Sequence, residues 1–210
     1  MKITLLLIAI NVLVFTYSLT DFGNIIDQYG FKPSAFLAGE YYRIFTSIFL
    51  HGNLAHILAN MVALWLLGFA VEKKIKSWQY LLVYLTGGII GNLIMLLPIF
   101  ASPNSVGVGA SGAISAIIGF GTFFSPGRFV ILPPLLPLPF IVVGALYFLT
   151  QALNIFNPSR IAYPVHLVGM LVGAFFGLAW IEERKWRVVL FLLTLAFIIV
   201  LPDILRLIFT

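Results

Sequence analysis

A tract without a single Asp, Glu, Lys or Arg runs from Ser77 to Gly127. A helix that crosses the ~30 Å hydrocarbon core of a bilayer needs about 20 apolar residues, so this tract is too long for one crossing. Pro98 and the polar cluster 101–105 divide it into two. Over the whole chain 61% of the residues are hydrophobic and 9% are charged, whereas about a quarter of the residues of a soluble domain are charged. The sequence therefore indicates a polytopic membrane protein and excludes a soluble globular domain.

Seven apolar segments are long enough to be membrane-spanning helices, although Pro202, Asp203 and Arg206 interrupt the last one. We expect an all-α, polytopic bundle of seven transmembrane helices that forms one domain over residues 1–210. The expected spans are Ile3–Leu19, Leu54–Val71, Trp78–Phe100, Val106–Phe124, Leu135–Phe156, Val165–Ile181 and Val188–Phe209.

Lysine and arginine are unevenly distributed between the two sides of this predicted topology. If Met1 is cytoplasmic, the inside connections hold eight of the 12 basic residues and the outside holds four. The positive-inside rule then places the N-terminus in the cytoplasm and, with seven spans, the C-terminus outside. This asymmetry accounts for the net charge of +5, so the charge does not call for a nucleic-acid partner.

The first outside connection, Thr20–Asn53, is long and rich in aromatic and aliphatic side chains. Such side chains favour the membrane interface, so we expect a partly helical loop embedded in the outer leaflet. Non-helical backbone at that depth is tolerated only against protein or a water-filled cavity. The loop therefore predicts a wet cavity below the outer surface.

Three histidines, His51, His56 and His166, all fall near the outer end of an expected span. Asn60 lies one turn after His56 on the same helical face. Polar side chains in such places often only join helices by hydrogen bonds, and three histidines also suggest a metal site. No carboxylate shares their depth, and the offset from His51 to His56 is not the i, i+4 pair that chelates best. We therefore expect neither a metal nor another cofactor. The absence of cysteine also excludes thiolate chemistry.

Ser111 stands among small residues in Gly109-Ala110-Ser111-Gly112, at the start of the second half of the uncharged tract. Glycines that recur every four residues let two helices approach closely. If the glycine faces of the fourth and sixth expected spans pack together, Ser111 and His166 meet at one depth. The alternative is that these glycines serve packing alone. The small residues are Gly112, Ser115 or Ala116, and Gly119 in the fourth span, and Gly169, Gly173 and Gly177 in the sixth.

Taken together, these motifs resemble the rhomboid intramembrane serine proteases. Gly109-Ala110-Ser111-Gly112 is similar to their GxSG motif, and His166-Leu167-Val168-Gly169 to the HxxG motif of their sixth core helix. The run from His51 through His56 to Asn60 is similar to the H-x4-H-x3-N pattern of their second helix. Tyr42-Arg43 stands where the family has a tryptophan-arginine pair.

The resemblance implies a core of six helices over about residues 1–183 and an extra C-terminal helix at about 187–209. It implies Ser111 as nucleophile and His166 as general base, without the aspartate of the soluble serine proteases. His56 and Asn60 then belong to an oxyanion hole, together with the Ser111 backbone amide, and Gly109 and Ala110 lie against the substrate. Two positions depart from the family pattern. Ser115 stands where a tyrosine often supports the catalytic histidine, and Tyr42 replaces the tryptophan.

The expected function is an intramembrane serine endopeptidase in the plasma membrane, which cleaves transmembrane segments of single-pass or other membrane proteins near the outer face. Its partners are then these substrates and the lipid bilayer, with no nucleic acid and no metal. Two alternatives come from other classes: a catalytically silent relative that binds membrane clients, and a small transporter. The prolines at 133, 134, 137 and 139, before the fifth span, are either part of a movable substrate gate or simple helix ends.

Overall fold

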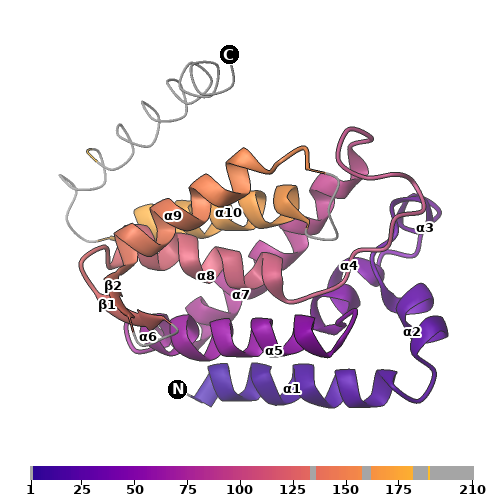
Figure 1. Cartoon of the computed structure of the whole chain (residues 1–210), viewed down its shortest axis with the longest axis horizontal. Coiled ribbons are helices and arrows are strands. Elements are labelled where there is room, and N and C mark those ends of the chain that lie inside the picture. Colours follow the sequence, from indigo (N-terminus) through magenta and orange to yellow (C-terminus); the bar gives the residue numbers. More distant parts are fainter. Residues whose placement is uncertain (1, 133–135, 158–161, 182–188, 190–210) are drawn as a thin grey trace.

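The computed structural model describes residues 2–132, 136–157, 162–181 and 189. Helices form most of this part of the chain, and the long ones lie side by side (Figure 1). Single turns of 3₁₀ helix at Ser47–Phe49 and Ile94–Leu96, and of π-helix at Leu64–Gly68, extend or interrupt them. The elements are α1 Lys2–Ser18, α2 Phe22–Tyr29, α3 Pro33–Leu37, α4 Arg43–Thr46, α5 Leu54–Ala63, α6 Phe69–Glu72, α7 Ser77–Leu93, α8 Ser111–Phe124, β1 Phe129–Leu132, β2 Leu136–Pro139, α9 Phe140–Leu153 and α10 Tyr163–Trp180.

The predicted helical membrane protein is confirmed. Within the described residues, three helical stretches are long and apolar enough to cross a membrane: Leu54–Glu72, Ser77–Leu96 and Tyr163–Trp180. The remaining three expected spans that the structure describes appear as shorter apolar helices, α1, α8 and α9. The seventh expected span, Val188–Phe209, lies outside the described residues apart from Val189.

Two of the predicted helices begin later than the sequence suggested. The fourth was expected from Val106 but begins at Ser111. The backbone before it is extended and tied to the first loop, because Phe31 and Gly107 exchange backbone hydrogen bonds of 2.8 and 2.9 Å and the Gly109 N–H donates to the Ser47 carbonyl. Gly109 itself has φ +130°, a conformation that other residues rarely adopt.

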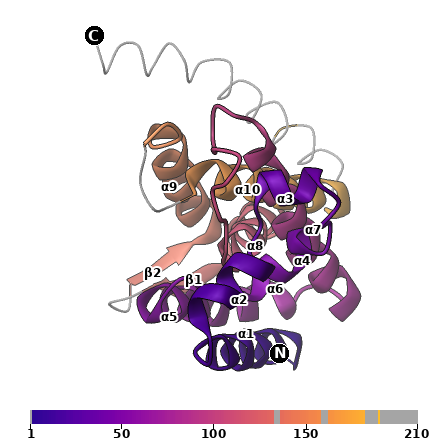
Figure 2. The same cartoon turned by 90° about the vertical axis from the view of Figure 1, so that its right-hand side faces the viewer.

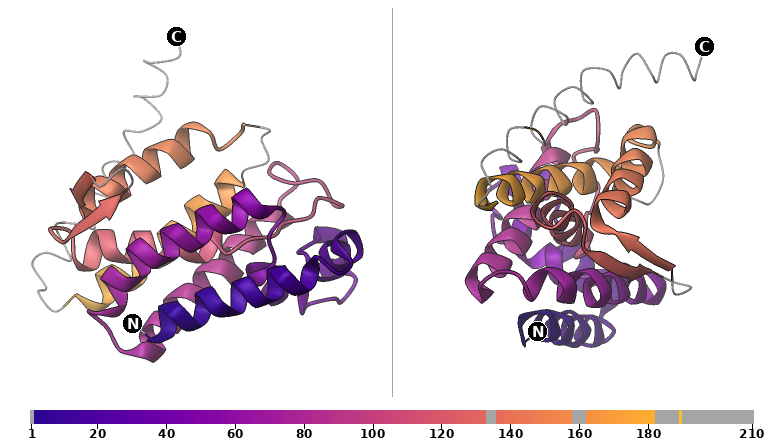
Figure 3. Two further views of the ribbon diagram at one scale, coloured as in Figure 1. Left: turned by 60° about the horizontal axis from the view of Figure 1, so that its bottom comes forward. Right: turned by 90° about the vertical axis from the view of Figure 1, so that its left-hand side faces the viewer.

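The fifth helix was expected from Leu135 but begins at Phe140, because its proline-rich approach forms an antiparallel hairpin, β1–β2. Pro137 pairs with Ile131, and Pro139 with Phe129. A two-stranded ribbon accepts prolines because both of its strands are edges. The side chain of Val130 is buried in the core at the inner face of β1. The hairpin, β1 and β2, lies at the end of the bundle opposite α2, α3 and α4 (Figures 1 and 3). We call these the hairpin end and the loop end.

Helix α8 lies at the centre of the molecule, in contact with α5, α7, α9 and α10 (Figure 2). Every residue from Gly112 to Thr122 is buried. The helix has 14 residues, so it is only about 21 Å long at 1.5 Å per residue. Its first residue, Ser111, lies at the loop end and is half-buried.

The close packing of α8 on α10 depends on glycine, as the sequence predicted. A Cβ on Gly169 would lie 2.2 Å from the Gly112 carbonyl oxygen, and one on Gly173 would lie 1.8 Å from the Ala116 carbonyl oxygen. Both distances are far below van der Waals contact, so only a glycine fits at either position. Ser115 is not part of this face, because its side chain contacts α9 instead.

A buried carboxylate fixes the start of α1. Glu72, at the end of α6, accepts hydrogen bonds from the Ile3 and Thr4 backbone N–H groups and from the Thr4 hydroxyl. These N–H groups belong to the first turn of α1. The N–H groups in the first turn of a helix have no carbonyl partner within that helix. The negative charge also lies at the positive end of the α1 dipole. These contacts with the start of α1 explain why the Glu72 carboxylate is buried at the hairpin end.

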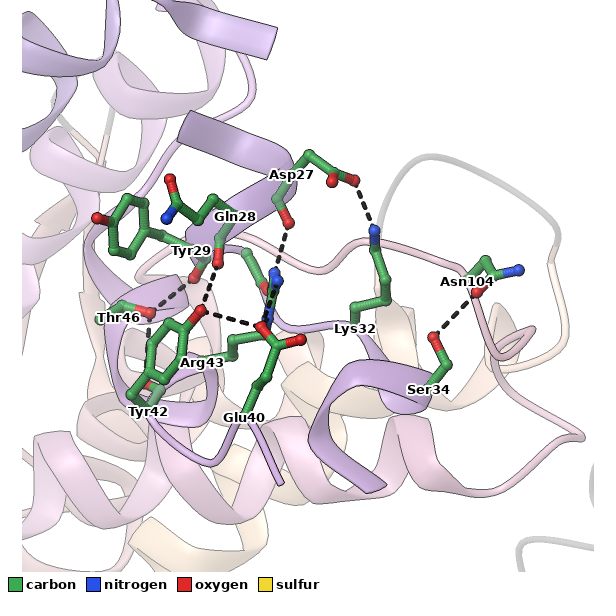
Figure 4. A network of polar contacts seen from close by, with 11 residues as sticks. Asp27, Gln28, Tyr29, Lys32, Ser34, Glu40, Tyr42, Arg43, Thr46 and Asn104 are labelled. Carbon is green, nitrogen blue, oxygen red and sulfur yellow. Dashed lines mark hydrogen bonds and ion pairs between the residues drawn. The ribbon is translucent and has the colours of Figure 1, made fainter. Parts of the chain in front are cut away.

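The first loop contains short helices, α2, α3 and α4, which confirms its partly helical character. Figure 4 shows the polar network that holds it together around Arg43. The guanidinium donates to the backbone carbonyls of Asp27 and Gly30 and forms an ion pair with Glu40 at 2.7 Å. Hydrogen bonding to Arg43 lowers the pKa of Glu40 below its usual value. The arginine of the Tyr42-Arg43 pair therefore joins the end of α2 to the start of α4.

Candidate active site

Ser111 and His166 are in direct contact. The His166 Nε2 atom lies 2.7 Å from the Ser111 Oγ atom, within the range for a nucleophile and its base. Ser111 is the first residue of α8, and His166 lies in the first turn of α10. The glycine contacts between these two helices bring their loop ends together. The serine and the histidine therefore meet because two rigid, tightly packed elements present them.

Two side chains of α9 lie against the same histidine, and the sequence analysis named neither. The Nδ1 atom of His166 lies 3.0 Å from Gln151 Oε1. The ring of Tyr147 packs beside the imidazole, with the ring centroids 6.4 Å apart and the planes 30° from parallel. Tyr147 and Gln151 are four apart, on one face of α9. This spacing of two polar side chains in an otherwise apolar segment is the sequence signal that could have identified them.

The contacts of Ser115 explain why this position holds a serine. Its Oγ donates to the Ser111 carbonyl at 2.7 Å and lies 2.6 Å from the Tyr147 hydroxyl. Since the serine proton is already used, the tyrosine hydroxyl is the donor of the second bond. The aromatic ring beside the histidine thus comes from α9, and the small side chain at position 115 leaves room for it.

His56 and Asn60 lie on the other side of the serine motif. The His56 Nδ1 atom accepts a hydrogen bond from the Gly52 N–H at 3.4 Å, so in the neutral ring Nε2 carries the proton. A Cβ on Gly109 would lie 2.8 Å from that Nε2 atom and 3.6 Å from Asn60 Nδ2. The Nδ2 atom of Asn60 is buried without a hydrogen-bond partner among the described residues. Two donors that have no acceptor among the described residues therefore lie beside the motif that contains Ser111.

Ala110 precedes Ser111, and we expected it, like Gly109, to lie against the substrate. It is completely buried, and neither residue is among those that line the cavity described below. Its position is the N-cap of α8, where no side chain of the described residues caps the helix. The first-turn N–H groups, including that of Ser111, have no carbonyl partner within the helix. Ala110 therefore forms the start of α8, and the backbone N–H groups that follow it are further hydrogen-bond donors.

A cavity of about 840 Å³ opens beside these groups. It is bordered by the side chains of Ser111, His166, His56 and Asn60. Its other walls come from the segments 52–53, 94–108 and 155–157 and from the start of α10, and they are largely apolar. A serine hydroxyl, an imidazole and hydrogen-bond donors thus converge on one space, which is the usual arrangement of an active site.

His51 does not belong to that space. Its side chain is fully buried and lies outside the cavity lining, with its ring against the edge of His56 at 5.1 Å between centroids. Within the described residues no group of three or more His, Cys, Asp or Glu side chains is placed to hold a metal ion.

Comparison with known proteins identifies a family. The family model described as the Rhomboid domain matches residues 38–183. The chain is 36% identical to the rhomboid protease GluP of Bacillus subtilis over 121 residues, which is 55% of this chain and 23% of GluP. It is 29% identical to RHOMBOID-like protein 12, mitochondrial, of Arabidopsis thaliana over 168 residues, 72% of this chain and 49% of that protein.

A third relative has a similar length. YdcA of Bacillus subtilis is 30% identical over 151 residues, which cover 71% of this chain and 72% of YdcA. By contrast, the match spans only about a quarter of GluP and half of the Arabidopsis protein. The matched region contains every candidate site residue named above, from His56 to His166.

Proposed function

The chain belongs to the rhomboid family, and on that premise we propose that it is an intramembrane serine endopeptidase with a Ser111–His166 dyad. The observation that carries the proposal is the 2.7 Å contact between Ser111 Oγ and His166 Nε2 beside a cavity that His56 and Asn60 also border. A serine hydroxyl is a weak nucleophile until a base accepts its proton. Neutral His166 is that base.

The reaction proceeds in two halves. Ser111 Oγ attacks the substrate carbonyl carbon as its proton moves to His166 Nε2, and the carbonyl oxygen becomes an oxyanion. His166 then returns the proton to the leaving amine, the C–N bond breaks, and an acyl ester remains on Ser111. Water enters the cavity, loses a proton to His166 and hydrolyses the ester, which restores the free serine.

The oxyanion is stabilised by donors that are already in place. Asn60 Nδ2, His56 Nε2 and the first-turn N–H groups of α8 all lie beside the serine motif. Fixed donors in a site shielded from bulk water are worth far more than the same donors in water, because they need not reorganise as charge develops.

The substrates are transmembrane segments of other membrane proteins. A helix has all its backbone groups bonded internally, so cleavage occurs where a segment unwinds near the end of its span. The enzyme lies in the plasma membrane with its N-terminus in the cytoplasm and its C-terminus outside. This orientation places the loop end, and with it the site, toward the outer face.

Labelling with a fluorophosphonate probe tests the proposal directly. We expect the purified protein in detergent to be labelled on Ser111 and, once labelled, to lose cleavage of a model transmembrane substrate. His166→Ala should abolish labelling, because the hydroxyl then has no base. The matched control is Ser105→Ala, since Ser105 borders the same cavity, and it should label normally.

Peptide mass spectrometry identifies the labelled residue. A folded parent protein that takes up no label and cleaves no substrate would support the alternative of a silent client-binding relative. A label elsewhere than on Ser111 would contradict the assignment of the nucleophile.

The oxyanion assignment makes a second prediction. Asn60→Leu is expected to lower kcat by about 10²- to 10³-fold with little change in KM, because the lost donor acts mainly in the transition state. The control is Asn11→Leu, which removes a buried amide of α1 that donates to the Leu7 carbonyl and does not border the cavity. Cleavage kinetics on one model substrate measure both variants. An Asn60 variant with the parent's kcat would remove Asn60 from the oxyanion hole.

A further inference from the structure

Gln151 lies on the side of His166 that faces away from the serine. Its side chain is 5% exposed, and its Oε1 atom lies 3.0 Å from His166 Nδ1. A neutral imidazole has one nitrogen that donates and one that accepts. The identity of the group at Nδ1 therefore decides which nitrogen faces Ser111 as the acceptor.

The orientation of the Gln151 amide is set by its neighbour in sequence. The Thr150 hydroxyl donates to the Tyr147 carbonyl at 2.7 Å, so its single proton is used. Its oxygen can then only accept, and the Gln151 Nε2 atom lies 3.1 Å away as the donor. With the NH₂ group directed to Thr150, the carbonyl oxygen of the amide is directed to His166.

The donor and acceptor of each hydrogen bond from Gln151 through His166 to Ser111 are therefore fixed. Gln151 Oε1 can only accept, so His166 Nδ1 carries the proton and its Nε2 carries the lone pair. That lone pair lies 2.7 Å from Ser111 Oγ, ready to accept the hydroxyl proton. If the amide were reversed, an N–H group would face Nδ1, the ring proton would move to Nε2, and the base would be blocked.

A neutral amide suits this depth. An aspartate in the same place would also accept from Nδ1–H, but an isolated carboxylate within the membrane is costly. The amide provides the same direction of hydrogen bonding without a net charge. Tyr147 limits rotation of the imidazole from one side, because its own hydroxyl is anchored on Ser115.

We propose that Gln151 is the positioning residue of this active site: it holds His166 in the tautomer that acts as base, and Thr150 fixes the Gln151 amide in the required orientation. The proposal rests on the dyad function proposed above. The two residues act through His166 and touch neither the substrate nor the reacting atoms.

Cleavage kinetics give the first test. Gln151→Met keeps the length of the side chain but removes the acceptor, and it is expected to lower kcat at least about tenfold with KM within about twofold, as for other groups that orient a functional histidine. Gln151→Glu restores an acceptor and should recover at least about fivefold of that loss. Thr150→Val should lower kcat several-fold, whereas Thr150→Ser should not. The matched control is Thr16→Val, which removes a similar exposed hydroxyl bonded to its own helix.

Nitrogen NMR of protein labelled with ¹⁵N-histidine, in detergent, gives a readout independent of activity. The parent should show His166, assigned by its loss in His166→Ala, with Nδ1 protonated and Nε2 unprotonated. Gln151→Met and Thr150→Val should show a mixture of both tautomers. Unchanged spectra and an unchanged kcat in both variants would overturn the proposal.

The two hypotheses fail in different ways. If the parent cleaves substrate and requires Ser111, but the Gln151 and Thr150 variants match it in rate and tautomer, only the positioning role is wrong. If no substrate is cleaved and no probe reacts, yet the tautomer changes in these variants, the hydrogen-bond series stands and the protease assignment is wrong.

Discussion

Ser111→Ala is expected to lower kcat for a transmembrane substrate by at least about 10⁴-fold, because no other group can form the acyl intermediate. His166→Ala should cost about as much, and the double variant should be no worse than either single variant. Residues that act as one unit show this lack of additivity. The measurement is cleavage of a model substrate in detergent or in liposomes, followed over hours to capture the residual rate.

The variants must stay folded for this comparison to hold. Ser111 is only partly buried and its hydroxyl is bonded to His166, so the alanine variant should keep the parent's thermal midpoint within a few degrees. Equal cleavage by Ser111→Ala and the parent would exclude the serine protease mechanism. Additive losses in the double variant would show that the two residues do not work together.

Gly173→Val is expected to prevent the bundle from assembling. Even the first added carbon would lie 1.8 Å from the Ala116 carbonyl oxygen, so the backbones of α8 and α10 would have to separate. Overpacking in well-packed cores already costs about 1 to 3 kcal/mol, and here the obstacle is rigid backbone. We expect a loss of about 3 kcal/mol or more in Gly173→Ala and no folded protein in Gly173→Val.

Thermal or denaturant unfolding in detergent measures this loss. The control is Gly23→Ala in α2, where an added Cβ would meet nothing within 4 Å. Cleavage should fall with stability in the Gly173 variants, because the same contact aligns Ser111 with His166. If Gly173→Ala were as stable as the parent, the close approach of the two helices would be wrong.

The meeting of Ser111 and His166 could be predicted from sequence because small residues recur at helical spacing in both spans. That periodicity fixes which faces pack, and packing fixes the depth of the residues that start each helix. His56 and Asn60 were noted because they lie one turn apart near the outer end of the second expected span, and their place in an oxyanion hole came from the family resemblance.

Other features carried no comparable signal. The prolines before α9 were read either as part of a substrate gate or as helix ends, because a single sequence does not show that Leu136–Pro139 has a strand partner in Phe129–Leu132. Gln151 was missed because its spacing of four residues from Tyr147 in an apolar helix matches no known motif, and its role depends on contacts from another helix. The place of Ala110 came from the family resemblance, and a motif does not show that the side chain at a helix N-cap is buried, as that of Ala110 is.

The short central helix α8 has a consequence for how the protein responds to its lipid surroundings. Membranes differ in thickness by several ångströms, and helices that contact lipid adapt by tilting or by distorting the bilayer. Residues Gly112–Thr122 are buried among neighbouring helices, so this stretch of α8 is shielded from that stress. Its length, and with it the distance of Ser111 from the hairpin end, is set by protein contacts alone. Bilayer thickness should therefore act on which peptide bond of a substrate reaches Ser111, while leaving the geometry of the dyad unchanged.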